Sequence, residues 1–117
     1  MKETKVMLIV GNDCADPAQE KEFNDWYHKH INEIKMTRPG VKRVARYQVS
    51  SVPVEGPPNA SYPKYLAVYE FDSEESLRAY ESHRTQQKEG KVAPLATPGP
   101  KPKGMWRKAY KMIDEAK

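Results

Sequence analysis

The chain has 117 residues, 38% of them hydrophobic, with ten prolines, so we expect one domain over residues 1–117 with long irregular segments. Its single cysteine, Cys14, excludes an internal disulfide framework and a cysteine-rich zinc cluster, and is typical of a reducing cytoplasm. The net charge of +4 indicates a solubilising surface or an anionic substrate; no nucleic-acid partner is expected, because the sequence has no zinc finger, RNP-type strand or phosphate-binding glycine loop.

The N-terminal segment MKETKVMLIV predicts a strand at residues 5–10. Both of its alternating sets of side chains are apolar, which is typical of a strand covered on both faces. The apolar run is far too short to cross a bilayer, and the segment lacks the long apolar region and the cleavage site of a signal peptide. We therefore expect a cytoplasmic protein that has no membrane as a partner.

A long helix is predicted next. Asp16 is a candidate N-cap, the proline after it suits the first helical position, and Gln19 completes a capping box. The Pro-Gly pair at 39–40 would end the helix, which is therefore expected to run to about Thr37.

The middle of the chain predicts two strands and a second helix. Strands are expected at 41–50 and 64–71, joined by a long, irregular, proline-rich loop at 51–63. A capping box formed by Asp72 and the glutamate three residues later predicts a helix over about 74–88, ended by a glycine.

The last elements complete an α+β, ferredoxin-like β-α-β-β-α-β order with an antiparallel sheet and two helices on one face. The prolines of 93–104 argue against regular structure there, and MWRKAYKMI at 105–113 predicts the fourth strand. Because the first and third strands are apolar on both sides, something must cover the second face of the sheet. The same sheet of a second copy is the simplest candidate and gives a homodimer; the alternative is an exposed apolar face.

The first predicted helix carries the side chains that are best suited to catalysis. Helical periodicity places its apolar side chains on one side, with His30 among them and His28 toward solvent. The apolar side chains of this face are Phe23, Trp26, Tyr27, Ile31 and Ile34. An inward imidazole is either a core histidine, satisfied by a tyrosine or a backbone carbonyl, or a general acid or base near neutral pH.

Two tyrosines could share a cleft with His30. Tyr47 shares a predicted strand face with Val41, and Tyr69 shares one with Tyr65. If those strand faces are directed toward the helices, the two tyrosine hydroxyls could polarise a substrate oxygen. The alternative for each tyrosine is ordinary packing. We therefore predict His30, Tyr47 and Tyr69 as the catalytic candidates.

The expected walls of the pocket are mainly aromatic. Trp26 and Trp106 are predicted first as packing residues and second as pocket walls, and Asn12 could position a carbonyl group. The predicted substrate-binding residues are Phe23, Trp26, Tyr27, Trp106 and Asn12. No metal site is expected, because the inward face of the helix offers no second ligand at metal spacing.

The stretches EFNDWYHKHINEIKMTRPGVKRVARYQV and PKYLAVYEF resemble the dimeric α+β barrel proteins, in particular EthD-like and related small bacterial proteins. The matching features are Phe23-Asn24, Trp26-Tyr27, His30, Pro39-Gly40 and Arg46-Tyr47. The histidine comes three residues after Tyr27, whereas the family pattern often has it four residues after, which is Ile31 here.

The resemblance implies a dimer whose two sheets face each other and a pocket between each sheet and its helices. It implies a cofactor-independent enzyme acting on a small aromatic or enolisable metabolite, of the lyase, isomerase, cyclase or monooxygenase type. The alternative is a non-catalytic binding or accessory dimer of a metabolic pathway. A pocket filled completely by side chains would favour the alternative.

Overall fold

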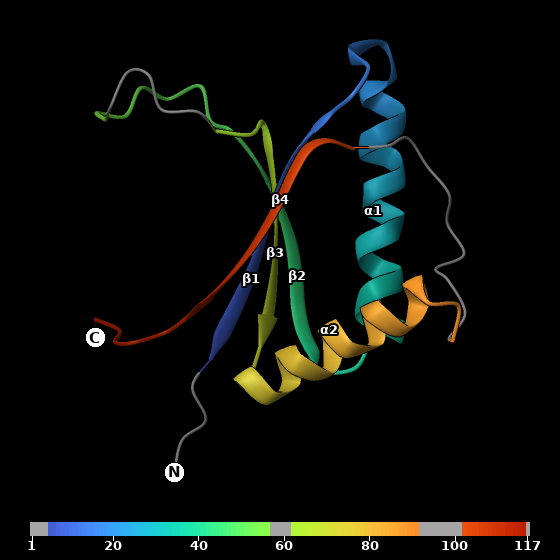
Figure 1. Ribbon diagram of the computed structural model, residues 1–117. Coiled ribbons are helices and arrows are strands. Elements are labelled where there is room, and N and C mark those ends of the chain that lie inside the picture. Colours follow the sequence, from blue (N-terminus) through green and yellow to red (C-terminus); the bar gives the residue numbers. More distant parts are fainter. Residues whose placement is uncertain (1–4, 57–61, 92–101, 117) are drawn as a thin grey trace.

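The computed structural model describes residues 5–56, 62–91 and 102–116, which form a four-stranded antiparallel sheet with two helices on one side (Figure 1). The elements follow the order β1 (Val6–Cys14), a 3-10 turn (Pro17–Gln19), α1 (Glu20–Thr37), β2 (Val41–Gln48), β3 (Tyr65–Phe71), α2 (Glu74–Lys88) and β4 (Pro102–Lys111). The strands lie in the order β2-β3-β1-β4. The predicted ferredoxin-like β-α-β-β-α-β fold is confirmed.

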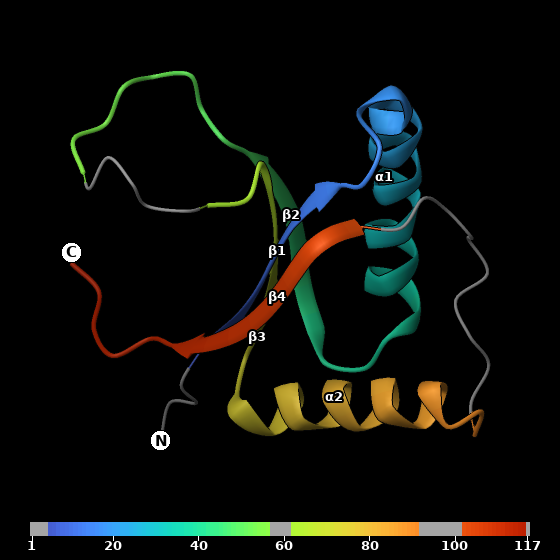
Figure 2. The same cartoon turned by 45° about the horizontal axis from the view of Figure 1, so that its top comes forward.

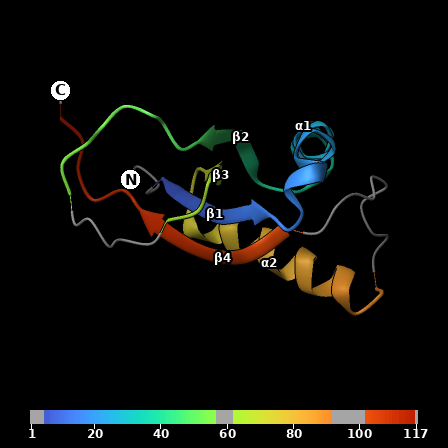
Figure 3. The same ribbon diagram turned by 90° about the horizontal axis from the view of Figure 1, so that it is seen from above.

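The two faces of the sheet differ in what covers them. Paired strand residues such as Leu8 and Tyr69 point toward the helices and are buried. Their neighbours Ile9 and Val68 pair on the opposite face, which we call the open face. Residues 49–56 and 112–116 extend beyond the sheet on the open-face side, away from the helices (Figures 1 and 3).

Helix α1 begins later than its capping signals suggest. The side chain of Asp16 accepts a hydrogen bond from the backbone N–H of Ala18 at 3.0 Å, but it caps the 3-10 turn, and the α-helix starts at Glu20. Arg38 ends the helix in an extended conformation, and Gly40 turns the chain with a φ of +79°, where a side chain would be strained.

Helix α2 has the predicted bounds of 74–88, but its cap is one residue later than expected. Ser73, not Asp72, is the N-cap, and its hydroxyl accepts from the backbone N–H of Ser76 at 3.1 Å. Figure 2 shows α2 crossing close to the C-terminal end of α1. There the Arg38 guanidinium donates to the side-chain carbonyl of Gln87 at 3.0 Å, which joins the two helices.

One buried cluster between the sheet and the helices holds the fold together. Its members are Val6, Leu8, Val10, Phe23, Tyr27, Ile34, Val41, Tyr65, Ala67, Tyr69, Phe71 and Tyr80. Asn12 is the polar residue buried with them, at 1% exposure, because β1 continues through the segment that was predicted as a loop.

A bulge in β2 corrects the prediction for Tyr47. The pairing shifts between Val41 and Arg43, so that Val41 pairs with Phe71 on the helix side while Tyr47 pairs with Leu66 on the open face. An uninterrupted strand would have kept Val41 and Tyr47 on one face, which was the basis for expecting Tyr47 near His30. The Tyr47 side chain is instead 49% exposed, on the side of the sheet opposite the helices.

The fourth strand also differs from the prediction. It begins at Pro102, inside the segment for which the prolines argued against regular structure. β4 is an edge strand paired to β1 alone, and proline is tolerated where a strand has no neighbour on one side. The rest of that segment, 92–101, lies outside the described residues, as do residues 57–61 of the other proline-rich loop. Neither helix in the described part of the chain is long and apolar enough to cross a bilayer.

The open face also holds Trp106, which pairs with Gly11 and is 42% exposed. A Cβ at Gly11 would lie 2.6 Å from Nε1 of the indole, which is too close for any real contact. Replacing Gly11 with alanine is therefore expected to displace Trp106 and cost about 1–3 kcal/mol of unfolding free energy, measured by urea denaturation. In a Trp106→Ala background the same change should cost much less; an equal cost in both backgrounds would contradict the contact.

Candidate active site

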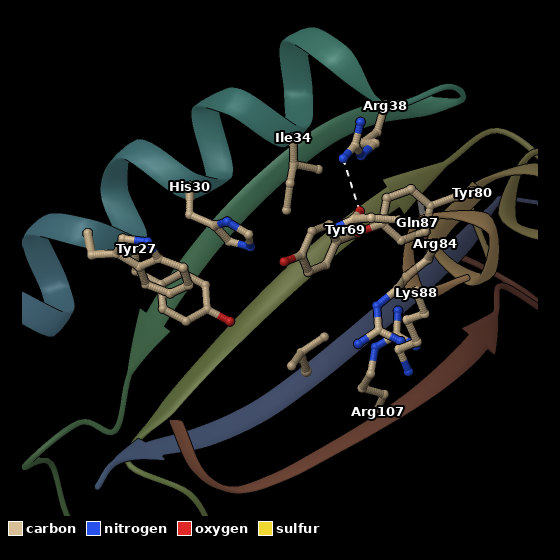
Figure 4. A pocket seen from close by; sticks show the side chains of 12 residues that line it. Tyr27, His30, Ile34, Arg38, Tyr69, Tyr80, Arg84, Gln87, Lys88 and Arg107 are labelled. Atoms are coloured by element: carbon tan, nitrogen blue, oxygen red, sulfur yellow. Dashed lines mark hydrogen bonds between the residues drawn. The ribbon is translucent and has the colours of Figure 1, made fainter. Parts of the chain in front are cut away.

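A cavity of about 290 Å³ lies between the sheet and the two helices (Figure 4). Its walls come from β1, α1, the residue after α1, β3, α2 and β4. The lining residues are Val10, Trp26, Tyr27, His30, Ile34, Arg38, Tyr69, Tyr80, Arg84, Gln87, Lys88 and Arg107. The volume is close to the lower end of the range for small-molecule sites, roughly 300–1,000 Å³. Side chains do not fill the predicted pocket.

His30 lies half-buried in the wall of this cavity, on the side of α1 that the periodicity indicated. Its ring stacks on Trp26 with centroids 4.5 Å apart and meets the ring of Tyr27 edge-on at 5.5 Å. Within the described part of the chain, nothing hydrogen-bonds to the buried Nδ1 atom. The next residue, Ile31, packs against the core and is not among the lining residues.

The electrostatic surroundings keep His30 neutral near pH 7. Burial lowers the pKa of the imidazole because it disfavours the charged form. The nearby charge of Glu33 raises that pKa and the charge of Arg38 lowers it. The balance is a lowered pKa, so the free imidazole can accept a proton at neutral pH.

Tyr27 is held in place from several directions. The side-chain amide of the buried Asn12 donates a hydrogen bond to the Tyr27 hydroxyl oxygen at 2.9 Å. Burial raises the pKa of Tyr27, while hydrogen bonds with Asn12 and Tyr69 and the charge of Arg46 lower it. Because the oxygen of Tyr27 accepts from Asn12, the Tyr27 proton is left to donate either to Tyr69 or to a ligand in the cavity.

Arg46 supports Tyr27 from the side of the sheet. Its guanidinium carbon lies 4.3 Å from the centroid of the Tyr27 ring and 4.9 Å from that of Tyr65, and its Nη1 donates to the side-chain oxygen of Asn24 at 3.0 Å. A cation against the face of a phenol ring is attracted to it. Sequence reasoning noted Arg46 only as part of the family pattern and missed this supporting role.

Tyr69 and Tyr80 form the middle of the cavity. Their rings are 6.0 Å apart, and burial raises the pKa of Tyr80 and raises that of Tyr69 well above its ordinary value. Both hydroxyls therefore stay protonated at physiological pH. Figure 4 shows the His30 ring turned toward the Tyr69 hydroxyl. Tyr80 was not predicted, although its place on the inward side of α2 was a usable signal.

The structure brings together only part of the predicted site. His30, Trp26, Tyr27 and Tyr69 line the cavity, and Asn12 lies behind them, bonded to Tyr27. The other predicted residues lie elsewhere: Phe23 is fully buried core, and Tyr47 and Trp106 lie together on the open face, across the sheet from the cavity.

A group of basic side chains at the other end of the cavity was missed. These are Arg38, Arg84, Lys88 and Arg107. The guanidinium of Arg107 forms a two-point ion pair with Glu81, with N–O distances of 2.6 and 3.1 Å. The spacing of Tyr80, Arg84 and Lys88, each four residues apart on α2, could have indicated that they share one helix face. Among the described residues, no three histidine, cysteine or acidic side chains are grouped so that they could hold a metal ion.

Two solved structures share this fold. A dimeric ferredoxin-like protein of unknown function from Thermobifida fusca aligns with a TM-score of 0.58 and 14% identity, over 94% of this chain and 92% of that one. A protein described as a putative monooxygenase from Shewanella loihica PV-4 aligns with a TM-score of 0.53 and 16% identity, over 98% of this chain and 99% of that one. No protein-family model and no curated protein matches the chain.

At these identities the likeness establishes the fold alone. It agrees with the ferredoxin-like architecture that the sequence resemblance implied, and neither neighbour is described as EthD-like.

Proposed function

We propose that this protein is an enzyme that performs acid–base chemistry on a small aromatic or enolisable metabolite with its own histidine and tyrosine side chains. The observation that carries the proposal is the buried Nδ1 of His30, which has no hydrogen-bond partner among the described residues and belongs to a ring on the wall of an open cavity. A buried polar atom without a partner costs stability, and such costs are typical of functional sites.

The arrangement supports proton abstraction by His30. The neutral imidazole would take a proton from an acidic C–H or phenol O–H group of the substrate. The Tyr27 hydroxyl, positioned by Asn12, would donate a hydrogen bond to the substrate oxygen on which negative charge develops. The apolar walls formed by Val10 and Ile34 would keep water from competing for the proton.

This chemistry is shared by lyases, isomerases, cyclases and monooxygenases that begin by forming an enolate or phenolate. The description of one structural neighbour as a putative monooxygenase favours the last of these. We propose a reaction that needs no added cofactor as the simplest use of the site. Non-catalytic binding of a metabolite in the same cavity is the alternative.

Hydrogen–deuterium exchange tests the proposal without knowledge of the full reaction. Small ketones, lactones and phenols would be incubated with the protein in D₂O, and loss of their acidic C–H signals followed by NMR. A base at the cavity wall is expected to accelerate exchange in at least one compound that the protein binds. Bound compounds whose exchange is never accelerated would favour the non-catalytic alternative.

We also propose that the open face pairs with the same face of a second copy. Its large side chains Met7, Tyr47, Trp106, Tyr110 and Met112 are all exposed in the single chain. The extended segments on this side add exposed Val52, Val54 and Ile113. The same face also carries Lys108, which pairs with Ile9, and the Arg43–Glu70 ion pair. A sheet face with this many exposed large apolar side chains is typical of an interface, and one structural neighbour is described as dimeric.

Replacing Ile9 with lysine is expected to convert the homodimer to a monomer, because Ile9 lies on a central strand of the open face and a buried, unpaired ammonium group is costly. Size-exclusion chromatography with light scattering measures the mass. Met36→Lys is the matched control, since Met36 is 85% exposed on α1, away from the sheet face. A wild-type protein that is monomeric, or a dimeric Ile9→Lys variant, would contradict the proposal.

A further inference from the structure

The charged side chains of the cavity are all of one sign in the described part of the chain. Arg38, Arg84, Lys88 and Arg107 line it, and no carboxylate does. Glu81 neutralises Arg107 from outside the lining, and Arg38 is bonded to a neutral amide. Among the described residues, no ion-pair partner is found for Arg84 or Lys88.

Helix electrostatics account for part of this group. Arg38 follows the last residue of α1 and Lys88 is the last residue of α2, where positive charge is favoured by the helix dipole. Arg84 is a full turn further into α2, and Arg107 is on a strand. Arg84 and Lys88 stand four residues apart on one helix, a spacing at which like charges repel. Stabilisation of the helix C-termini therefore does not explain all four basic side chains.

The basic end and the histidine end belong to one cavity. Figure 4 shows Arg84, Lys88 and Arg107 at one side, His30 and Tyr27 at the other, and Tyr69 between them. The charge of Arg38 acts on His30 and adds to the lowering of its pKa, and the charges of Arg84 and Arg107 act on Tyr69 and oppose the rise in its pKa that burial causes. A molecule that fills about 290 Å³ can thus reach both ends at once.

We propose, building on the acid–base function above, that the substrate carries a carboxylate, which the basic end binds while the reacting part lies between His30 and Tyr27. Guanidinium groups match the planar carboxylate with paired hydrogen bonds. The C-terminal ends of both helices point negative dipoles here, which repel a phosphate, with its larger negative charge, more strongly than a singly charged carboxylate. The anchor explains why Arg84 and Lys88 lie beside the cavity with no ion-pair partner among the described residues.

Benzoate and its neutral counterpart benzamide are the probes that test the carboxylate site, with phenyl phosphate as a third. Binding is measured by NMR titration of the full-length protein; molecules this small are expected to have a Kd on the order of 1 mM when they fit. Benzoate should bind at least about tenfold more tightly than benzamide, as expected for hydrogen bonds to a charged group. Arg84→Gln should weaken benzoate binding far more than benzamide binding and so remove most of that difference.

Arg78→Gln is the matched control, an exposed arginine of α2 that does not line the cavity. Arg84→Lys keeps the charge and serves where the glutamine variant does not fold; it should retain part of the preference for benzoate. The carboxylate assignment is overturned by equal binding of benzoate and benzamide, by no binding of either, by tighter binding of phenyl phosphate, or by an equal effect of Arg78→Gln. Isotope exchange in neutral ketones tests His30 separately, so either proposal can fail alone.

Discussion

Replacing His30 with asparagine is expected to reduce the rate of substrate proton exchange by about 10²- to 10⁴-fold, the usual contribution of a positioned general base. Asparagine keeps a polar side chain beside Trp26 but has no group that accepts a proton near neutral pH. The rate would be measured in D₂O by NMR with a compound that the wild-type protein exchanges. Substrate affinity should change far less than the rate, because the basic end of the cavity is untouched.

His28 provides the matched control for this experiment. It stands on the same helix but is exposed to solvent, and it does not line the cavity. His28→Asn should therefore exchange substrate protons at the wild-type rate. Full activity in His30→Asn, with a circular dichroism spectrum like that of the wild type, would exclude His30 as the base.

The pH dependence gives an independent check on His30. Burial lowers the pKa of its imidazole, so the exchange rate should be constant at neutral pH and fall only on the acid side of the ordinary histidine value of about 6.5. The same shift affects stability: between the folded and unfolded pKa values the unfolded chain binds more protons. The contribution of His30 to the free energy of unfolding is therefore fully present above its pKa in the unfolded chain. It is lost as the pH falls through its lower pKa in the folded chain. His30→Asn should remove both effects.

The fold could be predicted from local signals that tertiary packing did not override. Strands 5–10 and 64–71 have apolar side chains on both faces, and helix 74–88 is bounded by a cap and a glycine. The inward orientation of His30 followed from helical periodicity alone. These features depend on residues close together in the sequence, which is why one sequence suffices to find them.

The errors arose where a strand is irregular. The bulge between Val41 and Arg43 changes which side chains of β2 face the helices, and nothing in VKRVARYQ marks it. It moved Tyr47 from the expected cleft to the open face. Pro102 was read as a strand breaker because the edge position of β4 depends on the order of strands in the sheet, which is a tertiary property.

The basic end of the cavity could not be predicted for a related reason. Arg38, Arg84 and Arg107 come from the end of α1, from α2 and from β4, and only the folded chain brings them to one cavity. In the sequence each of them is one of twenty lysines and arginines. The net charge therefore indicated only a solubilising surface or an anionic substrate, and no position for a binding site. Asn12 was proposed for a carbonyl group of the substrate, and its amide instead bonds Tyr27 because β1 extends to Cys14.

Replacing Phe23 with alanine is expected to cost about 3–5 kcal/mol of unfolding free energy, a large part of the 5–15 kcal/mol typical of a domain. Phe23 is 0% exposed, and its ring meets Tyr27 edge-on at 5.4 Å and lies 5.8 Å from Tyr65, so its removal leaves a void beneath the cavity wall. Urea denaturation followed by circular dichroism measures the loss.

Phe23→Leu separates packing from contact with substrate, the role predicted for this residue from the sequence. Leucine fills most of the void and should restore most of the stability. If Phe23 acts only through packing, benzoate binding should recover together with stability, because the ring is not among the lining residues. A leucine variant that is stable yet has lost benzoate binding would show that the Phe23 ring contacts the ligand, and an alanine variant as stable as the wild type would show that the core is not packed around it.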